Sequence, residues 1–288
     1  MELASPITIY WDLPPGVEAQ DSLLRACADI AACRPLMLQL TDPSQSLGDG
    51  VRAVLERFGM TAVSVSLTIT PACFASLGND SISGLGVKEL LVALEHTADF
   101  RELRALPAGV GISFPVTKEN WRELPSLVAT CREHGISRLV LPMQRLYHDE
   151  ELFWLTRQEQ KVLENSLAVV GGAENLNLTI HDPFLWKAFN PGVPFPQGGC
   201  QAANTMIAIA ADGGVYPCPT LPVRLGTMGE RPLKEIISSA EKKEFRRRLL
   251  VTPEGCRECQ ELAECRGGCR GRAYVIQGTL DGIDEACR

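Results

Sequence analysis

The chain has 288 residues, which is enough for one large domain or two modest ones. Its net charge of −7 at pH 7 predicts no strongly basic face for nucleic acid, and it has no run of about 18 apolar residues that could span a membrane. The N-terminus lacks the basic and apolar regions of a secretory signal, so we expect a cytoplasmic protein with no nucleic-acid or membrane partner. In that reducing compartment, clustered cysteines indicate metal binding or catalysis before they indicate disulfides.

Short apolar runs alternate with amphipathic stretches up to about residue 185. The runs are β-branched or Leu-rich and bounded by Gly, Pro, Asp or Asn, and they predict strands at residues 7–11, 36–40, 63–69, 87–94, 110–114, 138–142 and 176–180. The stretches between them predict helices at residues 22–33, 47–58, 99–106, 121–134 and 150–167. This alternation predicts an α/β fold with a parallel sheet built from right-handed βαβ units. Seven strands are one short of a complete (β/α) barrel, so we expect a partial barrel or a strongly curved open sheet.

A segment rich in Pro and Gly, residues 190–199, cannot hold a helix and marks the predicted domain boundary. We expect a partial barrel over residues 1–189 and a small cysteine-rich domain over residues 190–288. In the second domain, residues 206–210 and 215–218 predict a β-hairpin around a Gly-based turn, and one helix is predicted over residues 233–249. The rest is Cys- and Gly-rich loop with a short helix, too poor in apolar residues to fold without a staple.

Seven of the eleven cysteines lie in the second predicted domain. They are spaced as Cys200-x12-Gly213-x4-Cys218, then Cys256-x2-Cys259-x5-Cys265-x3-Cys269, then Cys287. Thiolates at such short intervals can converge on a metal centre, and the glycines before Cys269 allow backbone N–H groups to approach a cluster. Eight thiolates would complete two four-iron clusters, so seven leave one iron in need of another ligand. A pair of zinc sites is the alternative, although only Cys256 and Cys259 have the spacing of a zinc knuckle.

This cysteine pattern resembles the SPASM domain, the auxiliary-cluster module of many radical S-adenosylmethionine (SAM) enzymes. The resemblance extends from Cys200 to Cys287 and includes Asp212-Gly213, Leu225-Gly226, Gly267-Gly268-Cys269-Arg270 and Asp284-x2-Cys287. It implies two 4Fe-4S clusters, the first held by Cys200, Cys218 and Cys269, and the second by Cys256, Cys259, Cys265 and Cys287. Some relatives take a fourth ligand for the first cluster from a cysteine just before the Cys200 position. Residues 194–199 contain none, so that position is open or filled by Asp182, His181, water or a partner's thiolate.

The first predicted domain resembles a radical-SAM barrel in its rhythm of strands and helices, but it lacks that family's signature. In the family, the loop after the first strand carries C-x3-C-x2-C, whereas residues 12–18 here contain no cysteine. The Gly-Gly-Glu-Pro segment that meets the methionine amine is replaced by residues 39–43, Gln-Leu-Thr-Asp-Pro. We therefore expect no S-adenosylmethionine and no reductive cleavage of it.

Other candidate residues favour structural roles. Cys27 and Cys33 lie in an amphipathic stretch and predict core packing, and the isolated Cys73 and Cys131 predict ordinary buried thiols. We expect surface or hydrogen-bonded side chains at His96, His134 and His148. The pair His181-Asp182 could form structural hydrogen bonds or bind metal. Core positions are expected for Trp154 and Trp186.

The leading functional expectation is an iron–sulfur accessory or electron-relay partner of a radical SAM/SPASM enzyme in peptide (RiPP) maturation, acting with that enzyme and a precursor peptide. Within the superfamily the chain is similar to the SPASM-domain companion protein of the GeoRSP peptide-modification system. Two alternatives remain open. One is a redox or peptide-modifying enzyme with chemistry at an open cluster iron, and the other is a binding module with structural metal only. No catalytic residue is assigned from the sequence.

Overall fold

A single mostly parallel sheet organises the chain. The computed structural model describes residues 3, 5–78, 82–103, 106–147, 151–174, 176–195 and 199–287. Its strands are β1 (Thr8–Asp12), β2 (Met37–Asp42), β3 (Ser64–Ile69), β4 (Glu89–Ala93), β5 (Val110–Ser113), β6 (Arg138–Leu141), β7 (Asn177–Ile180), β8 (Met206–Ile209), β9 (Gly214–Tyr216) and β10 (Gly226–Thr227). All seven strands predicted before residue 185 are confirmed.

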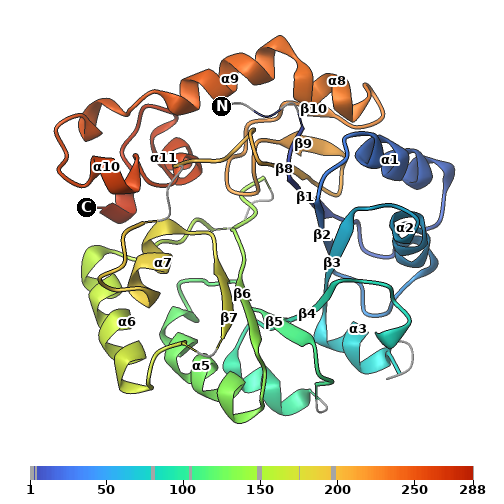
Figure 1. Cartoon of the computed structure of the whole chain (residues 1–288), viewed down its shortest axis with the longest axis horizontal. Helices are drawn as coiled ribbons and strands as arrows, with labels where there is room; N and C mark the ends of the chain where they lie inside the picture. Colours follow the sequence, from blue (N-terminus) through green and yellow to red (C-terminus); the bar gives the residue numbers. More distant parts are fainter. Residues whose placement is uncertain are drawn as a thin grey trace.

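The sheet curves around a central space without closing. Its strand order is β10-β9-β8-β1-β2-β3-β4-β5-β6-β7, with β10 and β7 at the two edges. Strands β1 to β7 are parallel to their neighbours, so their carboxyl ends lie on one side. Figure 1 shows the strands curving round the middle of the molecule with helices on the outer side. The α/β class and the incomplete barrel are therefore confirmed.

The predicted β-hairpin belongs to this same sheet. Strand β8 pairs in parallel with β1, so that Ile9 lies opposite Ile207, and β9 pairs antiparallel with β8. Ile207, Ile209 and Val215 are at most 1% exposed and pack in one core with Ile9. The hairpin is confirmed, and it extends the sheet across the boundary predicted at residue 190. That boundary remains a prediction.

Four predicted helices are confirmed: α1 (Asp21–Ala32), α2 (Asp49–Gly59), α5 (Leu124–Glu133), which follows the 3₁₀ turn η2 (Trp121–Glu123), and α6 (Arg157–Val169). The last of these was predicted to begin at residue 150, which is not described, but residues 151–156 are not helical and α6 begins after its capping residue Thr156. The α-helix predicted over residues 99–106 is wrong, because the chain forms the 3₁₀ helix η1 (Thr97–Glu102) and turns extended at Leu103; residues 104 and 105 are not described. Leu106 precedes Pro107, which disfavours helical backbone at that point.

The helix predicted over residues 233–249 is two helices, α8 (Leu233–Ser238) and α9 (Ala240–Leu250). Ser239 between them is extended, and its side-chain oxygen accepts the backbone N–H of Lys242 at 3.1 Å. A serine in this role starts a new helix and ends the old one. The short helices α3 (Pro71–Ser76) and α7 (Pro183–Phe189) were not predicted.

The C-terminal segment is built from four short elements joined by loops: η3 (Glu254–Cys256), α10 (Leu262–Cys265), α11 (Arg270–Gln277) and η4 (Glu285–Cys287). Figure 1 shows α10 and α11 above α7, on the same side of the molecule as α6. Among the described residues, no helix is both long and apolar enough to cross a bilayer.

The shared core predicts that the barrel and the hairpin unfold together. Ile209→Ala removes a fully buried side chain from β8 and should cost about 2–5 kcal/mol of unfolding free energy. Urea unfolding followed by tryptophan fluorescence and by far-UV circular dichroism should show one shifted midpoint in both signals. The matched control is Val169→Ala, at a side chain 87% exposed, which should stay within about 0.5 kcal/mol. A fluorescence midpoint that stayed at the wild-type value would show the hairpin to be an independent unit.

Candidate metal centre

Three cysteine side chains gather where the hairpin meets α11; we call Cys200, Cys218 and Cys269 the inner thiols. Cys218 follows β9, and Cys269 is the residue directly before α11. All three line a cavity of about 350 Å³. Burial raises the pKa of Cys218 well above its ordinary value, and the neighbouring Cys200 and Cys269 raise it further. The thiols therefore lie close enough to repel one another when ionised.

Backbone amides stabilise ionised sulfur at this place. Burial raises the pKa of Cys200, while the N–H groups of Ala202 and Arg270 oppose that rise. Burial likewise raises the pKa of Cys269 to about 12, against the opposing positive charge of Arg272. Without metal these thiols are protonated at neutral pH, and a bound metal would displace the protons and be stabilised by the same N–H groups.

The other four cysteines form a second group; we call Cys256, Cys259, Cys265 and Cys287 the outer thiols. Burial is the largest cause that raises the pKa of Cys256, and the nearby Cys265 and Cys259 raise it further. The pKa of Cys287 is raised to about 11, mainly by burial and then by the negative charge of Asp284. Cys256 and Cys265 raise it further. Cys256 is buried and Cys259 is exposed, so this group reaches the surface.

Both groups consist of cysteine thiols, a donor type that iron–sulfur clusters and zinc both take. All eleven cysteines are free thiols. Within the part of the chain that the structure describes, no group of three or more His, Cys, Asp or Glu side chains could hold one metal ion. A single zinc ion needs donors that converge at about 2.0–2.3 Å. An iron–sulfur cluster spreads its irons over a larger body and takes thiolate ligands, which is the donor set present here.

The buried side chain of Arg270 also indicates that an anionic group binds near the inner thiols. Arg270 is 1% exposed, and its Nε and Nη2 atoms have no hydrogen-bond partner among the described residues. Leaving a buried polar group unpaired costs about 1–3 kcal/mol, and more for a charged group. Arg270 lines the cavity of the inner thiols, so an anionic group bound there would give these atoms the partner that the protein does not supply.

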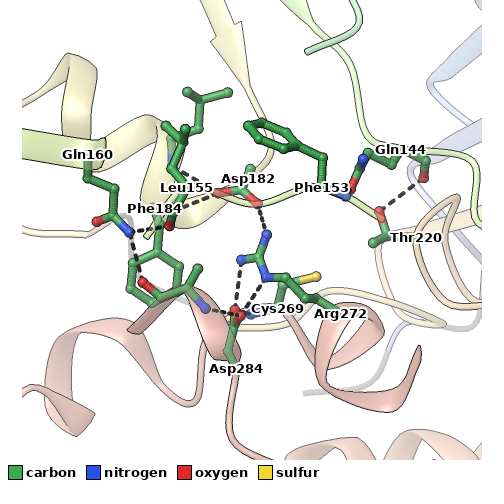
Figure 2. A network of polar contacts seen from close by, with 12 residues as sticks. Gln144, Phe153, Leu155, Gln160, Asp182, Phe184, Thr220, Cys269, Arg272 and Asp284 are labelled. Carbon is green, nitrogen blue, oxygen red and sulfur yellow. Dashed lines mark hydrogen bonds and ion pairs between the residues drawn. The ribbon is translucent and has the colours of Figure 1, made fainter. Parts of the chain in front are cut away.

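A buried ion network attaches the thiol-bearing segment to the barrel (Figure 2). Arg272 on α11 donates from Nε to Asp284 Oδ1 at 2.5 Å and from Nη2 to Asp284 Oδ2 at 2.9 Å. Its Nη1 donates to Asp182 Oδ2 at 2.5 Å. Burial opposes the charge of Arg272, but the two carboxylates raise its pKa well above the ordinary value. Asp284 Oδ2 also accepts the backbone N–H of Cys269 at 2.6 Å, which fixes the position of an inner thiol.

Asp182 is therefore occupied elsewhere and is a poor candidate for the fourth ligand. Its Oδ1 accepts the N–H groups of Phe184 and Leu185 at the start of α7, and its Oδ2 pairs with Arg272. His181 is accessible and lines both cavities, and its Nε2 lies 3.3 Å from the Tyr10 hydroxyl. Burial, then Arg145 and Arg138, lower the pKa of His181, so the ring is neutral at pH 7.

The carboxyl end of β1 is closed by charged and polar groups that the sequence did not reveal. Asp12 is 7% exposed, and Arg145 Nε lies 3.2 and 3.1 Å from its two carboxylate oxygens. The Tyr147 hydroxyl donates to Asp12 Oδ2 at 2.5 Å, and Arg145 Nη2 donates to Thr41 Oγ1 at 3.1 Å. No local motif indicates these contacts, because more than 130 residues separate Asp12 from its partners.

A second cavity, of about 560 Å³, lies within the curved sheet and adjoins the first. Arg145 lines this second cavity, and Met143, Gln144, Phe153 and His181 line both. These four side chains therefore form the border between the cavity of the inner thiols and the interior of the barrel.

The remaining sequence candidates behave mostly as expected. Cys27, Cys33, Cys73 and Cys131 are at most 2% exposed and belong to the hydrophobic core. His96 lies on the surface against Glu123, with 2.8 Å between Nδ1 and Oε1, and His134 stacks on Phe100. His148 lies outside the described residues. The core positions expected for Trp154 and Trp186 are wrong, because both rings are half-buried and line the first cavity.

Substitutions at two glycines test whether Asp284, which Arg272 holds, positions Cys269. Gly268→Ala would place a Cβ atom 2.5 Å from Asp284 Oδ2, at a backbone φ of +65°. Gly278→Ala introduces the same backbone strain, at φ +68°, with no atom within 4 Å. The strain costs each variant about 1–2 kcal/mol, and only Gly268→Ala also displaces Asp284. We expect Gly268→Ala to lose more unfolding free energy and more bound metal than Gly278→Ala. Equal losses would show that Asp284 does not position Cys269.

The cysteine-rich C-terminal segment resembles known proteins in sequence. Residues 200–260 match the family model SPASM, described as an iron–sulfur cluster-binding domain. An AdoMet-dependent heme synthase from Methanosarcina barkeri is 37% identical over 84 residues, which are 28% of this chain. The matched part spans only 23% of the length of that relative.

Solved structures resemble the whole chain. The Streptococcus suis protein SuiB bound to its precursor peptide SuiA is 17% identical, with a TM-score of 0.65 over 100% of this chain and 77% of that one. The protein anSMEcpe with bound AdoMet is 14% identical, with a TM-score of 0.61 over 98% of this chain and 91% of that one. At this identity the likeness shows a shared fold. Together the comparisons give the chain the fold of these proteins and an iron–sulfur cluster-binding segment over residues 200–260.

Proposed function

We propose that the chain binds two 4Fe-4S clusters and relays electrons for a radical SAM enzyme in peptide maturation. The inner thiols Cys200, Cys218 and Cys269 would hold one cluster, and the outer thiols Cys256, Cys259, Cys265 and Cys287 the other. A bound cluster supplies one-electron chemistry and an iron able to take an external ligand. The protein supplies backbone N–H groups, burial and positive charge around the sulfurs, the factors that set a cluster's potential.

The position of the two thiol groups carries this proposal. Cys259 is exposed, so an electron donor can approach the outer group from solvent. The inner thiols line a cavity inside the molecule, and Cys265 of the outer group lines the same cavity. One group at the surface and one at an internal cavity is the arrangement that a relay between a donor and a buried acceptor needs.

The end of β1 supports a role without SAM cleavage. Residues 12–18 contain no cysteine, and the first of them, Asp12, is engaged by Arg145 and Tyr147. These side chains place a buried ion pair where the relatives' cluster loop would begin. The partner that cleaves SAM would then be a separate, complete radical SAM/SPASM enzyme acting on a precursor peptide. In this proposal the chain would act as the SPASM-domain companion protein of the GeoRSP system does.

One observation favours a second function, a redox or peptide-modifying enzyme acting at an open iron. The inner group offers three thiols, and Asp182 is committed to Arg272. The cavity beside it is lined by Phe153, Trp154 and Trp186, which suits an apolar peptide side chain. Ligand exchange separates the two functions, since an added small thiol would change the electron paramagnetic resonance spectrum of an open site only.

Metal content tests the proposal directly. Protein reconstituted anaerobically should carry about eight irons and eight acid-labile sulfides per chain, as two four-iron clusters require. Cys259→Ala should reduce both values by about half, because it removes one outer ligand. Cys73→Ala, at a core thiol, is the matched control and should leave them unchanged. Zinc without labile sulfide would refute the proposal.

Radical chemistry gives the next expectation. The missing cysteines after β1 predict no 5′-deoxyadenosine when the reconstituted protein is incubated with S-adenosylmethionine and a strong one-electron reductant. Chromatography would compare the product with a no-protein blank and with a complete radical SAM enzyme as the positive control. Production above the blank would mean that this chain cleaves SAM itself.

A further inference from the structure

Arg270 is an unsatisfied buried cation at the junction of the two thiol groups. It occupies the first position of α11, directly after Cys269, and is 1% exposed. Its Nε and Nη2 atoms have no hydrogen-bond partner in the described part of the chain. A guanidinium group cannot shed its charge at physiological pH, so it cannot escape this cost by deprotonating. Such a group persists in a fold when something else pairs with it.

Arg270 lies beside one thiol of each group. Arg270 lines the same cavity as Cys200 of the inner group and Cys265 of the outer group, and its backbone N–H faces Cys200. Its charge interacts with Cys200, then with the carboxylate of Asp281, and then with Cys256 of the outer group. The adjoining Gly267 leaves room for the guanidinium, because a Cβ there would come within 3.3 Å of Arg270 Nη1. The guanidinium group therefore lies close to the backbone at Gly267.

The neighbouring buried arginines have other partners. Arg272 is satisfied by Asp182 and Asp284. Arg246 donates from Nη1 to the carbonyl oxygens of Cys200 and Ala202 at 2.7 and 3.1 Å. Arg270 differs from both because its Nε and Nη2 remain available to an added anionic group.

We propose that Arg270 is a counter-ion shared by the two clusters, donating from Nε and Nη2 to their sulfurs and favouring the reduced form of both. This proposal rests on the two-cluster function given above. Reduction adds one electron to a cluster, supplied by a one-electron reductant, and makes the cluster more negative. A fixed positive charge in a buried, low-dielectric place stabilises that added charge, and N–H donors to sulfur act in the same direction. Arg270 is a positioning and tuning residue rather than a catalytic one.

The test measures the midpoint potentials of both clusters in the reconstituted full chain, by redox titration followed by electron paramagnetic resonance. Arg270→Met keeps most of the side-chain volume and removes the charge. We expect both potentials to fall by at least about 59 mV, a tenfold change in a one-electron equilibrium. Arg270→Lys keeps the charge and should give a smaller fall. The matched control Arg257→Met removes an exposed arginine from between Cys256 and Cys259 and should change neither potential by that amount.

The outcomes are distinct. Unchanged potentials in Arg270→Met with full iron content would overturn the proposal, as would a fall in one potential only. If Arg270→Met binds no iron while Arg270→Lys binds it fully, the positive charge is required for the clusters and the proposal stands. Loss of iron from both variants would make Arg270 a packing residue and refute it. Wild-type protein without two clusters would instead refute the proposed function, so the two failures can be told apart.

Discussion

The pairing of Arg272 with Asp182 and Asp284 is the interaction on which the metal centre depends. Arg272 belongs to α11, Asp182 begins α7 at the end of β7, and Asp284 lies in the C-terminal loop, so one side chain joins three separate parts of the chain. Removing one partner of such a buried pair costs about 3–5 kcal/mol, because it leaves an uncompensated charge in the interior. The same Asp284 accepts the N–H of Cys269, so the network that holds the segments together also sets a ligand.

Weaker contacts extend this attachment along α6. Arg157 Nε donates to the carbonyl oxygen of Cys287 at 2.5 Å, and Gln160 Nε2 donates to that of Ala286 at 2.8 Å. These bonds place the last outer thiol against a barrel helix. The cysteine-rich segment is poor in apolar residues, yet barrel groups hold it at α11 and at its last thiol, Cys287. Cluster binding would add to a framework that already brings the thiols together, and its free energy would contribute directly to folding.

The sequence predicted those parts of the structure that depend on local pattern. Strands β1 to β7 follow from runs of apolar residues, whereas the assignment of the seven cysteines to two clusters stays a prediction from the SPASM resemblance. The helices α3 and α7 were missed because they are short and begin at prolines, Pro71 and Pro183, with too few residues to show a helical period. The break at Ser239 was missed because the apolar pattern runs through it, and only the serine's capping role ends the first helix. Asp12 with Arg145, and Asp182 with Arg272, join residues far apart in the chain, which no spacing rule could connect.

The position of the inner thiols follows from the way the sheet is completed. Because β8 pairs with β1, the hairpin brings Cys218 to the rim of the curved sheet, and α11 brings Cys269 to the same place. The backbone N–H of Leu146 donates to the carbonyl oxygen of Pro219 at 3.1 Å, and the Thr220 hydroxyl donates to that of Gln144 at 3.3 Å, which ties the loop after β9 to the loop after β6. The loop after β6 also supplies Arg145 to Asp12 and lines both cavities. Met143, Gln144, Phe153 and His181 line both cavities and so form the border between the barrel interior and the inner thiols. On the barrel side of that border, Arg145 holds the buried Asp12 at the carboxyl end of β1, and on the other side lie thiols of the C-terminal segment.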